Sequence, residues 1–357
     1  MGAMQSSGAI SISQVETQFG GSAATSFSEY YRGGTYVPTA ATSASGIPTS
    51  GGISLSNFYS AEPHGESVYT TPGTYTWTCP PGVTSVYVVC IGGGASGDGY
   101  YESTYYCSCP CYGGCRSVEY YSQNGGGGGG LAWKTVSVSP GTTYTVQVGS
   151  GGVYAHGDGW GGGGLSWFGY DGLVTGYGGN GRYGGSYTGD GGGSGGLGGI
   201  QPYTYGKNGV TPYIQNFSGG GGGAGGYSGP GGNGMCDIYF DAGNKYGPYD
   251  DSDFGPSHPA YGVSGGSGGG GGGGGYSTRG GGVGVYGEGD SGGAGSASLS
   301  SGGHSGNDYY RWPGGLNWAN AGGDGSGGSY GYGGYGSIGG MYGAAQNGGS
   351  GAVRISW

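Results

Sequence analysis

The sequence predicts a mainly β protein with irregular segments and little α-helix, in which a jelly-roll-like β-sandwich carries a slab of packed polyglycine II helices. Strand-like patterns occupy about 66–94, 131–152 and 350–357, whereas glycine dominates most of 150–350. Within the glycine runs, side chains recur at every third position. Because strands come early and one comes last, they enclose the glycine-rich insert. We therefore expect 66–357 to form one sandwich whose connections have expanded into glycine helices.

Residues 1–65 differ in composition from the remainder, and we expect them to form a separate segment. They are rich in Ser and Thr and repeat one phrase, as "GAISISQVETQFG" at 8–20 and "GGISLSNFYSA" at 51–61. The first copy predicts a short helix that is capped by Ser13, with Glu16 at the capping-box position. So few large apolar side chains predict no independent core. We expect this segment to become ordered by docking on another surface.

Three stretches carry the β signal. The stretch "GTYTWTCPPGVTSVYVVCIGGG" at 73–94 predicts two strands joined by a Pro-Pro-Gly turn. The stretch at 131–152 repeats this form around a Ser-Pro-Gly turn, and "SGAVRISW" at 350–357 predicts a last strand. These strands would fix where each glycine segment begins and ends.

The glycine segments have a period of three. In "GDGGGSGGLGGI" at 189–200, Ser194, Leu197 and Ile200 are each separated by two glycines. The same period recurs at Ala224, Tyr227, Pro230 and Asn233, and at Tyr332, Tyr335, Ile338, Met341 and Ala344. A period of three matches neither a strand nor an α-helix, but it is the period of the polyproline II helix. Bare faces would let backbones bond to one another, with side chains only on faces that look outward.

Composition excludes several classes of function. Gly accounts for 107 of 357 residues and charged residues for 8%, which is typical of disordered chains, but 36 Tyr residues favour order. The net charge of −10, with nine Lys plus Arg scattered singly, argues against nucleic-acid binding. No apolar run approaches the ~20 residues of a membrane span. The N-terminus lacks the pattern of a signal peptide, so we expect assembly in the cytoplasm.

No catalytic pattern or cofactor site is predicted, and we expect no enzymatic activity. The four His residues are dispersed, and no nucleophile or zinc motif accompanies them. Two carboxylates that pair only in the folded chain would have no pattern in the sequence. Asp250, Asp251 and Asp253 lie in one loop, but the glycine and distal glutamate of a calcium loop are absent. We interpret them as a solvated acidic loop.

Four cysteines crowd into "YYCSCPCYGGCRS". Cys107, Cys109, Cys111 and Cys115 have spacings that match neither zinc nor iron–sulfur motifs. Disulfides or free thiols are the favoured interpretation, and a metal site is the alternative. The remaining cysteines, Cys79, Cys90 and Cys236, are expected to be small buried residues.

Aromatic residues are the main candidates for binding. They gather in irregular segments at 98–123, 201–217, 235–262 and 304–321. The candidate rings are Tyr100, Tyr101, Tyr105, Tyr106, Tyr246, Tyr249, Tyr309, Tyr310, Trp312 and Trp318. Such rings suit sugars or a protein surface, because they offer rigid contact area with polar tips. The alternative is that they cover the glycine helices, an interpretation that we adopt for Tyr227, Tyr332 and Tyr335 and leave open for 309–318.

The strand framework and the terminal phrases together resemble bacteriophage glycine-rich tail-fibre and baseplate proteins. The phrases "ISIS" and "ISLSNFYSA" look like N-terminal segments of virion proteins, and the glycine slab resembles the polyglycine tip adhesins of T-even-like tail fibres. A similar framework occurs in the glycine-rich domain of anaplastic lymphoma kinase receptors. The framework covers about a quarter of the chain.

The resemblance implies a virion protein that attaches to the host. Its expected partners are other tail or baseplate proteins and a host glycan or outer-membrane protein, with several copies or a homo-oligomer in each particle. The residues expected to dock on the virion are Ile10, Ile12, Phe19, Ile53, Leu55 and Phe58. The main alternative is a purely structural virion component, and a secreted Gly/Tyr-rich coat protein is a further alternative.

Overall fold

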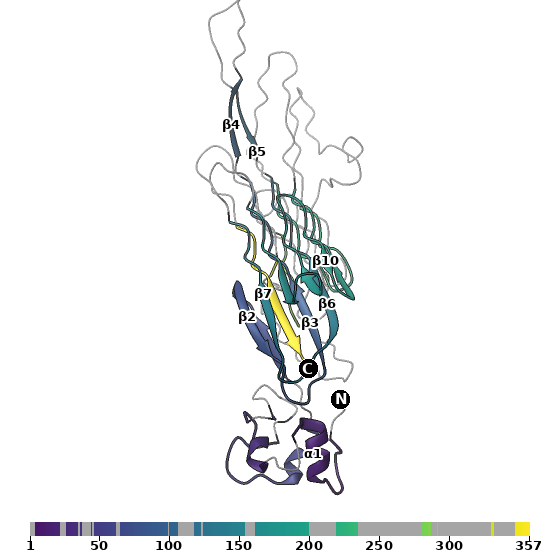
Figure 1. The fold of residues 1–357 in the computed structure, drawn as a ribbon. Coiled ribbons are helices and arrows are strands. Elements are labelled where there is room, and N and C mark those ends of the chain that lie inside the picture. The colour runs from purple at the N-terminus through teal and green to yellow at the C-terminus, as the bar shows by residue number, and fades with distance from the viewer. Residues whose placement is uncertain are drawn as a thin grey trace, which may run out of the picture.

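The protein is mainly β and contains very little helix, as the sequence predicted (Figure 1). The described residues form two five-stranded antiparallel sheets and a two-stranded ribbon. The computed structural model describes residues 4–21, 26–34, 36–37, 44, 46–61, 65–98, 100–105, 118–122, 124–153, 161–199, 219–234, 280–286, 291, 330–331 and 347–357, with the backbone alone at 100–105 and 118–122.

The first sheet holds the last strand of the chain next to early ones. Its order is β1 (Glu66–Tyr69), β12 (Ala352–Ser356), β3 (Ser85–Ile91), β6 (Leu131–Ser137) and β11 (Gly191–Gly193). Val353 of β12 lies opposite Tyr69 on one side and opposite Cys90 on the other. The glycine-rich insert is therefore closed at its end by a strand inside this sheet.

The second sheet is built mostly from consecutive strands. Its order is β10 (Tyr187–Thr188), β9 (Val174–Gly176), β8 (Ser166–Gly169), β7 (Thr143–Val148) and β2 (Gly73–Thr78). The two-stranded ribbon consists of β4 (Tyr100–Tyr105) and β5 (Val118–Ser122). In Figure 1 this ribbon lies at the opposite end of the molecule from the N-terminal helix.

Two Pro-Gly turns carry the chain between the sheets. Gly82 and Gly141 both have φ of 77°, which glycine adopts readily at the third position of a type II turn. The turns are closed by hydrogen bonds from Val83 N to Pro80 O at 3.3 Å and from Thr142 N to Ser139 O at 3.1 Å. Thus β2 and β3 belong to different sheets, as do β6 and β7.

One hydrophobic core joins the two sheets. In β2, Trp77 is buried whereas Thr76 and Thr78 are exposed, because alternate side chains point to opposite faces. Trp77 meets Phe168 of the same sheet in an edge-on contact, with ring centroids 5.9 Å apart. Core side chains from the first sheet include Val86, Val88 and Cys90 of β3, Val136 of β6, and Val353 and Ile355 of β12.

The N-terminal part contains the expected short helix, but its cap was predicted wrongly. Helix α1 (Ile12–Phe19) begins after Ser11, which has an extended backbone and accepts a hydrogen bond from Gln14 N. The Gln14 side chain in turn accepts from Ser11 N at 2.7 Å, which completes a capping box. Ser13 lies inside the first turn, where its carbonyl accepts from the Thr17 hydroxyl.

The second copy of the phrase forms a similar start. The 3₁₀ helix η3 (Leu55–Phe58) begins after Ser54, whose amide donates to the Asn57 side chain at 2.8 Å. Ser54 and Asn57 thus correspond to Ser11 and Gln14. The aromatic residues that end the two phrases meet, because the rings of Phe19 and Phe58 lie 5.6 Å apart in an edge-on arrangement.

The expectation that the N-terminal segment lacks a core was wrong. Its buried hydrophobic residues are Met4, Ile10, Val15, Phe19, Tyr30, Val37, Ala44, Ile47, Phe58 and Ala61. Three of the ten are aromatic, and one of these, Tyr30, is fully buried while its hydroxyl donates to Gly20 O at 2.7 Å. We refer to this part, 4–61, as the N-terminal unit. It packs against the turn between β2 and β3, where a β-carbon on Gly20 would lie 3.2 Å from Gly82 N.

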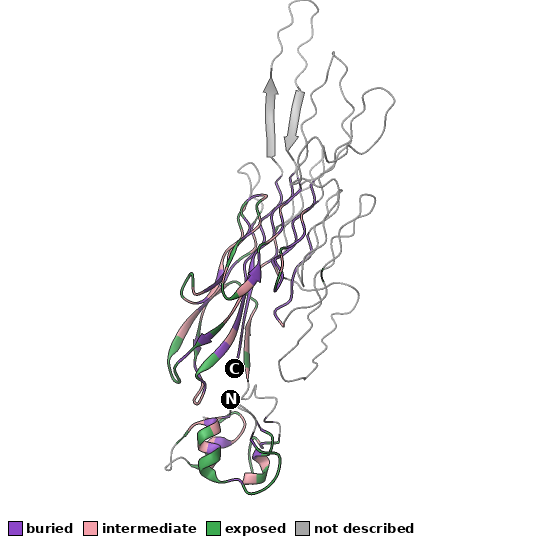
Figure 2. Ribbon diagram, turned by 90° about the vertical axis from the view of Figure 1, so that its right-hand side faces the viewer, coloured by how far each residue is buried: buried purple, intermediate pink, exposed green. Residues whose placement is uncertain are grey.

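Beyond the sheets, glycine-rich segments bond to one another through their backbones. We call these segments the glycine array: 92–98, 124–130, 149–153, 161–164, 176–186, 194–199, 219–234 and 347–351. Figure 2 shows buried residues continuing from the strands into these segments. Residues 124–130 are all buried, although six of the seven have no side chain to bury.

Hydrogen bonds in the array repeat every third residue. Along 92–98, every third amide reaches the same neighbouring segment: Gly92 to Gly130, Ala95 to Gly127 and Asp98 to Asn124, at 2.9, 2.8 and 2.8 Å. The next amides in turn reach another segment, Gly93 to Gly164 and Ser96 to Gly161, both at 2.9 Å. A chain with three residues per turn presents its amides in this way.

Side chains in the array do not all face outward, contrary to the expectation from their spacing. Ser194 and Pro230 are exposed, but Ala224 is fully buried and Tyr227 is 4% exposed. Both contact a second hydrophobic cluster on the outer face of the first sheet, whose other members are Val89, Ile91, Leu131, Val283, Val285 and Ala352. The apolar face of this sheet requires a cover, and the array supplies it.

Candidate functional site

The aromatic candidates lie mostly in parts of the chain that the structure does not describe. Tyr100, Tyr101 and Tyr105 belong to β4, which pairs with β5. The candidates outside the described residues are Tyr106, Tyr246, Tyr249, Tyr309, Tyr310, Trp312 and Trp318, the acidic residues Asp250, Asp251 and Asp253, the loop cysteines Cys107, Cys109, Cys111 and Cys115, and Cys236, Tyr332 and Tyr335. Described residues nevertheless adjoin three of the four aromatic segments and show where each of these three is attached.

Flanking residues of two aromatic segments lie together at one end of the array. Asp98 and Asn124, which precede and follow the segment that contains β4 and β5, are joined by a backbone hydrogen bond of 2.8 Å. Gly199, which precedes 201–217, accepts from Gly125 N at 2.9 Å and donates to Gly220 O at 2.8 Å. The chain therefore leaves and re-enters the array at the same level for both segments.

A third aromatic segment begins at this level. Gly234, which precedes 235–262, donates to Leu197 O at 2.7 Å, and a β-carbon on it would meet the backbone of Gly220 and Gly199. We call this end, marked by Asp98, Asn124, Gly199 and Gly234, the far end of the array. Figure 1 shows β4 and β5 rising from it, opposite α1.

The fourth aromatic segment, 304–321, adjoins no described residue; Ser291 is the nearest before it and Tyr330 the nearest after it. Tyr330 and the earlier Tyr286 pack against the cluster on the outer face of the first sheet. Tyr286 lies under the guanidinium of Arg354 of β12, 5.3 Å from the ring centroid, and Tyr330 forms an isolated bridge with Val283. These described residues thus lie beside the first sheet and not at the far end of the array.

The residues expected to dock on the virion are divided by the structure. Ile10, Phe19 and Phe58 belong to the core of the N-terminal unit, and Phe19 and Phe58 have no exposed surface. Ile53 and Leu55 are half-buried at the edge of that core, whereas Ile12 is 39% exposed. Of the six, Ile12 has the most surface for a partner, and Ile53 and Leu55 have some.

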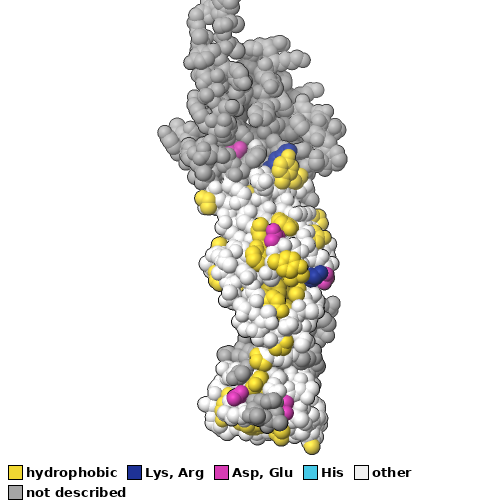
Figure 3. Space-filling view, in the orientation of Figure 1, with side chains coloured by type: hydrophobic (Ala, Val, Ile, Leu, Met, Phe, Trp, Pro, Cys, Tyr) yellow, Lys and Arg dark blue, Asp and Glu magenta, His cyan; other side chains and the backbone are white. Residues whose placement is uncertain are grey.

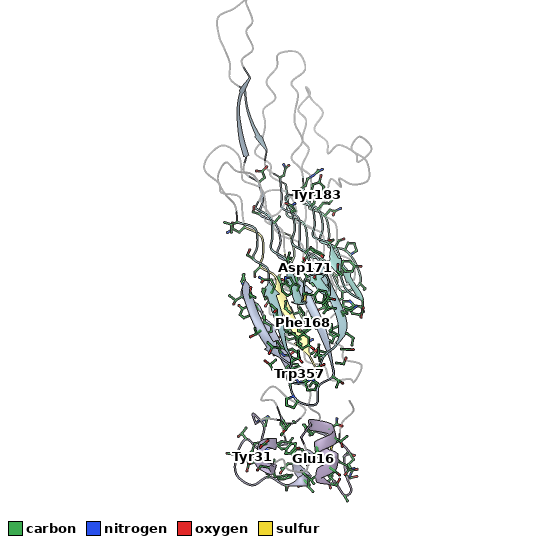
Figure 4. All side chains as sticks on the ribbon, in the orientation of Figure 1. Glu16, Tyr31, Phe168, Asp171, Tyr183 and Trp357 are labelled. Carbon is green, nitrogen blue, oxygen red and sulfur yellow. The ribbon has the colours of Figure 1, made fainter. Side chains whose placement is uncertain are left out.

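A turn at the far end carries side chains that the sequence did not single out. Asn180, Gly181, Arg182 and Tyr183 connect two segments of the array, and Tyr183 is 56% exposed. Figure 4 places Tyr183 at this end of the molecule, with Asp171, Phe168 and Trp357 following in order toward the N-terminal unit. The signal in the sequence was a glycine directly after Asn180, which suits the first central position of a type II′ turn, followed by an arginine and a tyrosine.

On the face that Figure 3 shows, the described residues present few charged side chains. Lys134 of β6 pairs with Asp190 at 2.7 Å, and this hydrogen bond lowers the pKa of the Asp190 carboxyl. Arg354 is buried and pairs with the half-exposed Glu66 of β1 at 2.9 Å. Both pairs join neighbouring elements of the first sheet, which assigns them a structural role.

The described residues contain no cluster of three His, Cys, Asp or Glu that could hold a metal ion. Cys79 and Cys90 are buried free thiols, as the sequence predicted. Burial raises the pKa of Cys79 to about 11 and that of Cys90 further, so both are protonated near neutral pH. They therefore lack the thiolate that nucleophilic chemistry requires.

Comparison with known proteins assigns no family. No protein-family model matches the chain, and no curated protein matches its sequence. Within the described part of the chain, no helix has the length and apolar character needed to cross a membrane.

Proposed function

We propose that the two sheets form a β-sandwich and that the glycine array is a bundle of polyglycine II helices that extends from it. The three-residue repeat of backbone hydrogen bonds along 92–98 supports this assignment. Residues 124–130 also support it, because they bond to segments on several sides, as the central member of such a bundle would. The second hydrophobic cluster, at Ala224 and Tyr227, anchors the bundle to the first sheet.

We further propose that this protein is a bacteriophage virion protein and that the far end of the array binds the host surface. The observation that carries this proposal is the polarity of the molecule. Three aromatic segments start from a far end whose backbone is fixed by hydrogen bonds, whereas the N-terminal unit has its own core at the opposite end. Loops held on a rigid platform are where binding function concentrates.

In this proposal the N-terminal unit attaches the protein to the particle. Its exposed Ile12 and half-buried Ile53 and Leu55 are the docking candidates that remain accessible. Other tail or baseplate proteins would be its partners, and several copies would be present in each particle. The far end would then point away from the particle toward a glycan or an outer-membrane protein.

The proposal is tested by locating the protein on phage particles. Antibodies against the purified protein would label particles for electron microscopy, and excess protein would be added to cells before particles. Label at the tail tip together with blocked adsorption supports the adhesin. Label on the capsid or along the tail, without blocked adsorption, supports the structural alternative. Absence of label from all particles contradicts a virion protein.

The docking role has a separate test. A variant that lacks residues 1–61 keeps Gly65, which exchanges two backbone hydrogen bonds of 3.0 Å with Trp357, and it keeps the core between the sheets. We expect this variant to fold but to be missing from particles. If it is incorporated at the level of the full chain, the N-terminal unit is not the docking element.

A further inference from the structure

The turn Asn180–Tyr183 holds its side chains on a fixed backbone. Asn180 and Tyr183 exchange two backbone hydrogen bonds, of 2.9 and 3.0 Å, and are paired as an isolated antiparallel bridge. Gly181 has φ of 58°, which only glycine adopts easily at the first central position of a type II′ turn. The two central residues, Gly181 and Arg182, are therefore fixed in a tight turn.

The array fixes this turn from two further sides. Gly127 N donates to Gly181 O at 2.8 Å, and Gly198 N donates to Arg182 O at 2.7 Å. Gly198 adjoins Gly199, so the turn lies at the far end of the array, where the aromatic segments are attached. Four backbone hydrogen bonds thus restrain the turn.

Within the turn, Arg182 stacks on Tyr183. The guanidinium carbon lies 5.0 Å from the centroid of the ring, and Nη2 donates to the phenol oxygen at 3.2 Å. An arginine held over an aromatic ring loses less side-chain freedom when it binds a ligand, because its plane is already oriented. The ring itself keeps 56% of its surface exposed.

These two side chains combine two binding chemistries. A guanidinium presents a planar fork of N–H donors that matches a carboxylate or a phosphate. An exposed tyrosine ring offers an apolar surface with a polar tip, which suits the face of a sugar. Arg182 is one of nine basic residues in a chain of net charge −10, and Asp98, the acidic residue that also marks this end, is buried.

We propose that Arg182 and Tyr183 bind an acidic sugar, with the guanidinium on its anionic group and the tyrosine ring against the sugar face. The inference rests on the proposed host-binding role of the far end and narrows it to a glycan that carries a negative charge. A uronic acid and a phosphorylated sugar share this chemistry, and the test below separates them.

The test measures binding of the full-length protein by calorimetry to three probes: trigalacturonate, mannose 6-phosphate and neutral maltotriose. We expect one anionic probe to bind at least tenfold more tightly than maltotriose. Which of the two binds identifies the source of the charge. Failure of both anionic probes to exceed maltotriose overturns the inference.

Variants assign the binding to the pair. Arg182→Gln should weaken binding of the anionic probe at least tenfold, and Arg182→Lys should weaken it less because the charge remains. Tyr183→Ala should weaken binding several-fold, whereas Tyr183→Phe keeps the ring and should have a smaller effect. Lys134→Gln removes the same charge from the side of the molecule and is the matched control. An Arg182→Gln protein that binds like the wild type, or an equal loss in the control, overturns the inference.

The inference and the proposed function fail in different ways. Arg182→Gln protein that blocks adsorption as well as the wild type leaves the adhesin standing and removes this sugar site. If trigalacturonate or mannose 6-phosphate binds in a way that depends on Arg182, but no phage particle carries the protein, the sugar site is supported and the virion role is contradicted.

Discussion

The close packing of backbones in the glycine array predicts a large effect of one methyl group. In Gly128→Ala, the new β-carbon would lie 2.5 Å from the carbonyl carbon of Gly223 and nearer still to its oxygen. Carbon atoms in contact are normally 3.5–4.0 Å apart, so the two segments must separate by about 1 Å. Neither side can give way by rotating a side chain, because both are backbone.

The cost follows from the hydrogen bonds that this separation disturbs. Gly128 donates to Gly196 O at 3.0 Å and accepts from Gly185 N at 2.8 Å, and Gly196 N donates to Gly223 O at 2.8 Å. A typical net contribution is about 1 kcal/mol per bond, and a buried group left unpaired costs about 1–3 kcal/mol. We therefore expect Gly128→Ala to lower the free energy of unfolding by about 3–6 kcal/mol.

Gly162→Ala is the matched control within the same array. Its β-carbon would meet no atom closer than 3.7 Å, and Gly162 is exposed. The substitution restricts the unfolded chain and should be neutral or stabilising by up to about 1 kcal/mol. Urea denaturation of both variants, followed by circular dichroism, measures the difference. Equal midpoints for Gly128→Ala and Gly162→Ala would refute close contact between backbones.

Two further predictions concern the first sheet and the core. Glu66→Gln removes the carboxylate that pairs with the buried Arg354, and it should destabilise the protein by about 1–2 kcal/mol, since Glu66 is partly hydrated. Lys134→Gln, at a more exposed pair, should change the urea midpoint less. The reverse order would contradict the assigned burial. The Cys79 thiol, whose pKa is raised to about 11, should resist iodoacetamide at pH 8 until the protein unfolds, as peptide mass spectrometry would show. The pKa of each thiol is higher in the folded than in the unfolded protein, so the stability that depends on Cys79 and Cys90 is complete below about pH 8.5 and declines as the pH rises toward 11. Labelling of Cys79 as fast as free cysteine would contradict the first expectation. Stability that increases over this pH range would contradict the second.

Local patterns predicted the parts of the fold that depend on neighbours in sequence. Alternation around Trp77 and Val146 gave strands, and the capping phrase gave a helix at Ile12–Phe19, although Ser11 rather than Ser13 caps it. The spacing of side chains by three corresponds to backbone bonds that repeat by three. Each of these features follows from the conformation of one short segment.

Features that depend on distant parts of the chain were not predicted. The core of the N-terminal unit brings together Phe19, Tyr30 and Phe58, which are too far apart in sequence to form a visible pattern. Ala224 and Tyr227 point inward because the sheet beside them has an apolar face. The spacing of these two residues in the sequence does not show that they lie against that face. The position of Arg182 over Tyr183 likewise depends on a turn that two other segments restrain.

The place of β12 between β1 and β3 affects how the protein is made. On a ribosome that adds 5–20 residues per second, β3 is complete about 10–50 s before Ala352 is synthesised. During that interval one edge of β3 has no partner, and an unpaired edge of Val and Ile residues readily joins other chains. We infer that the first sheet closes only after translation has passed residue 356, and that slow translation of the glycine-rich region promotes aggregation of the nascent chain.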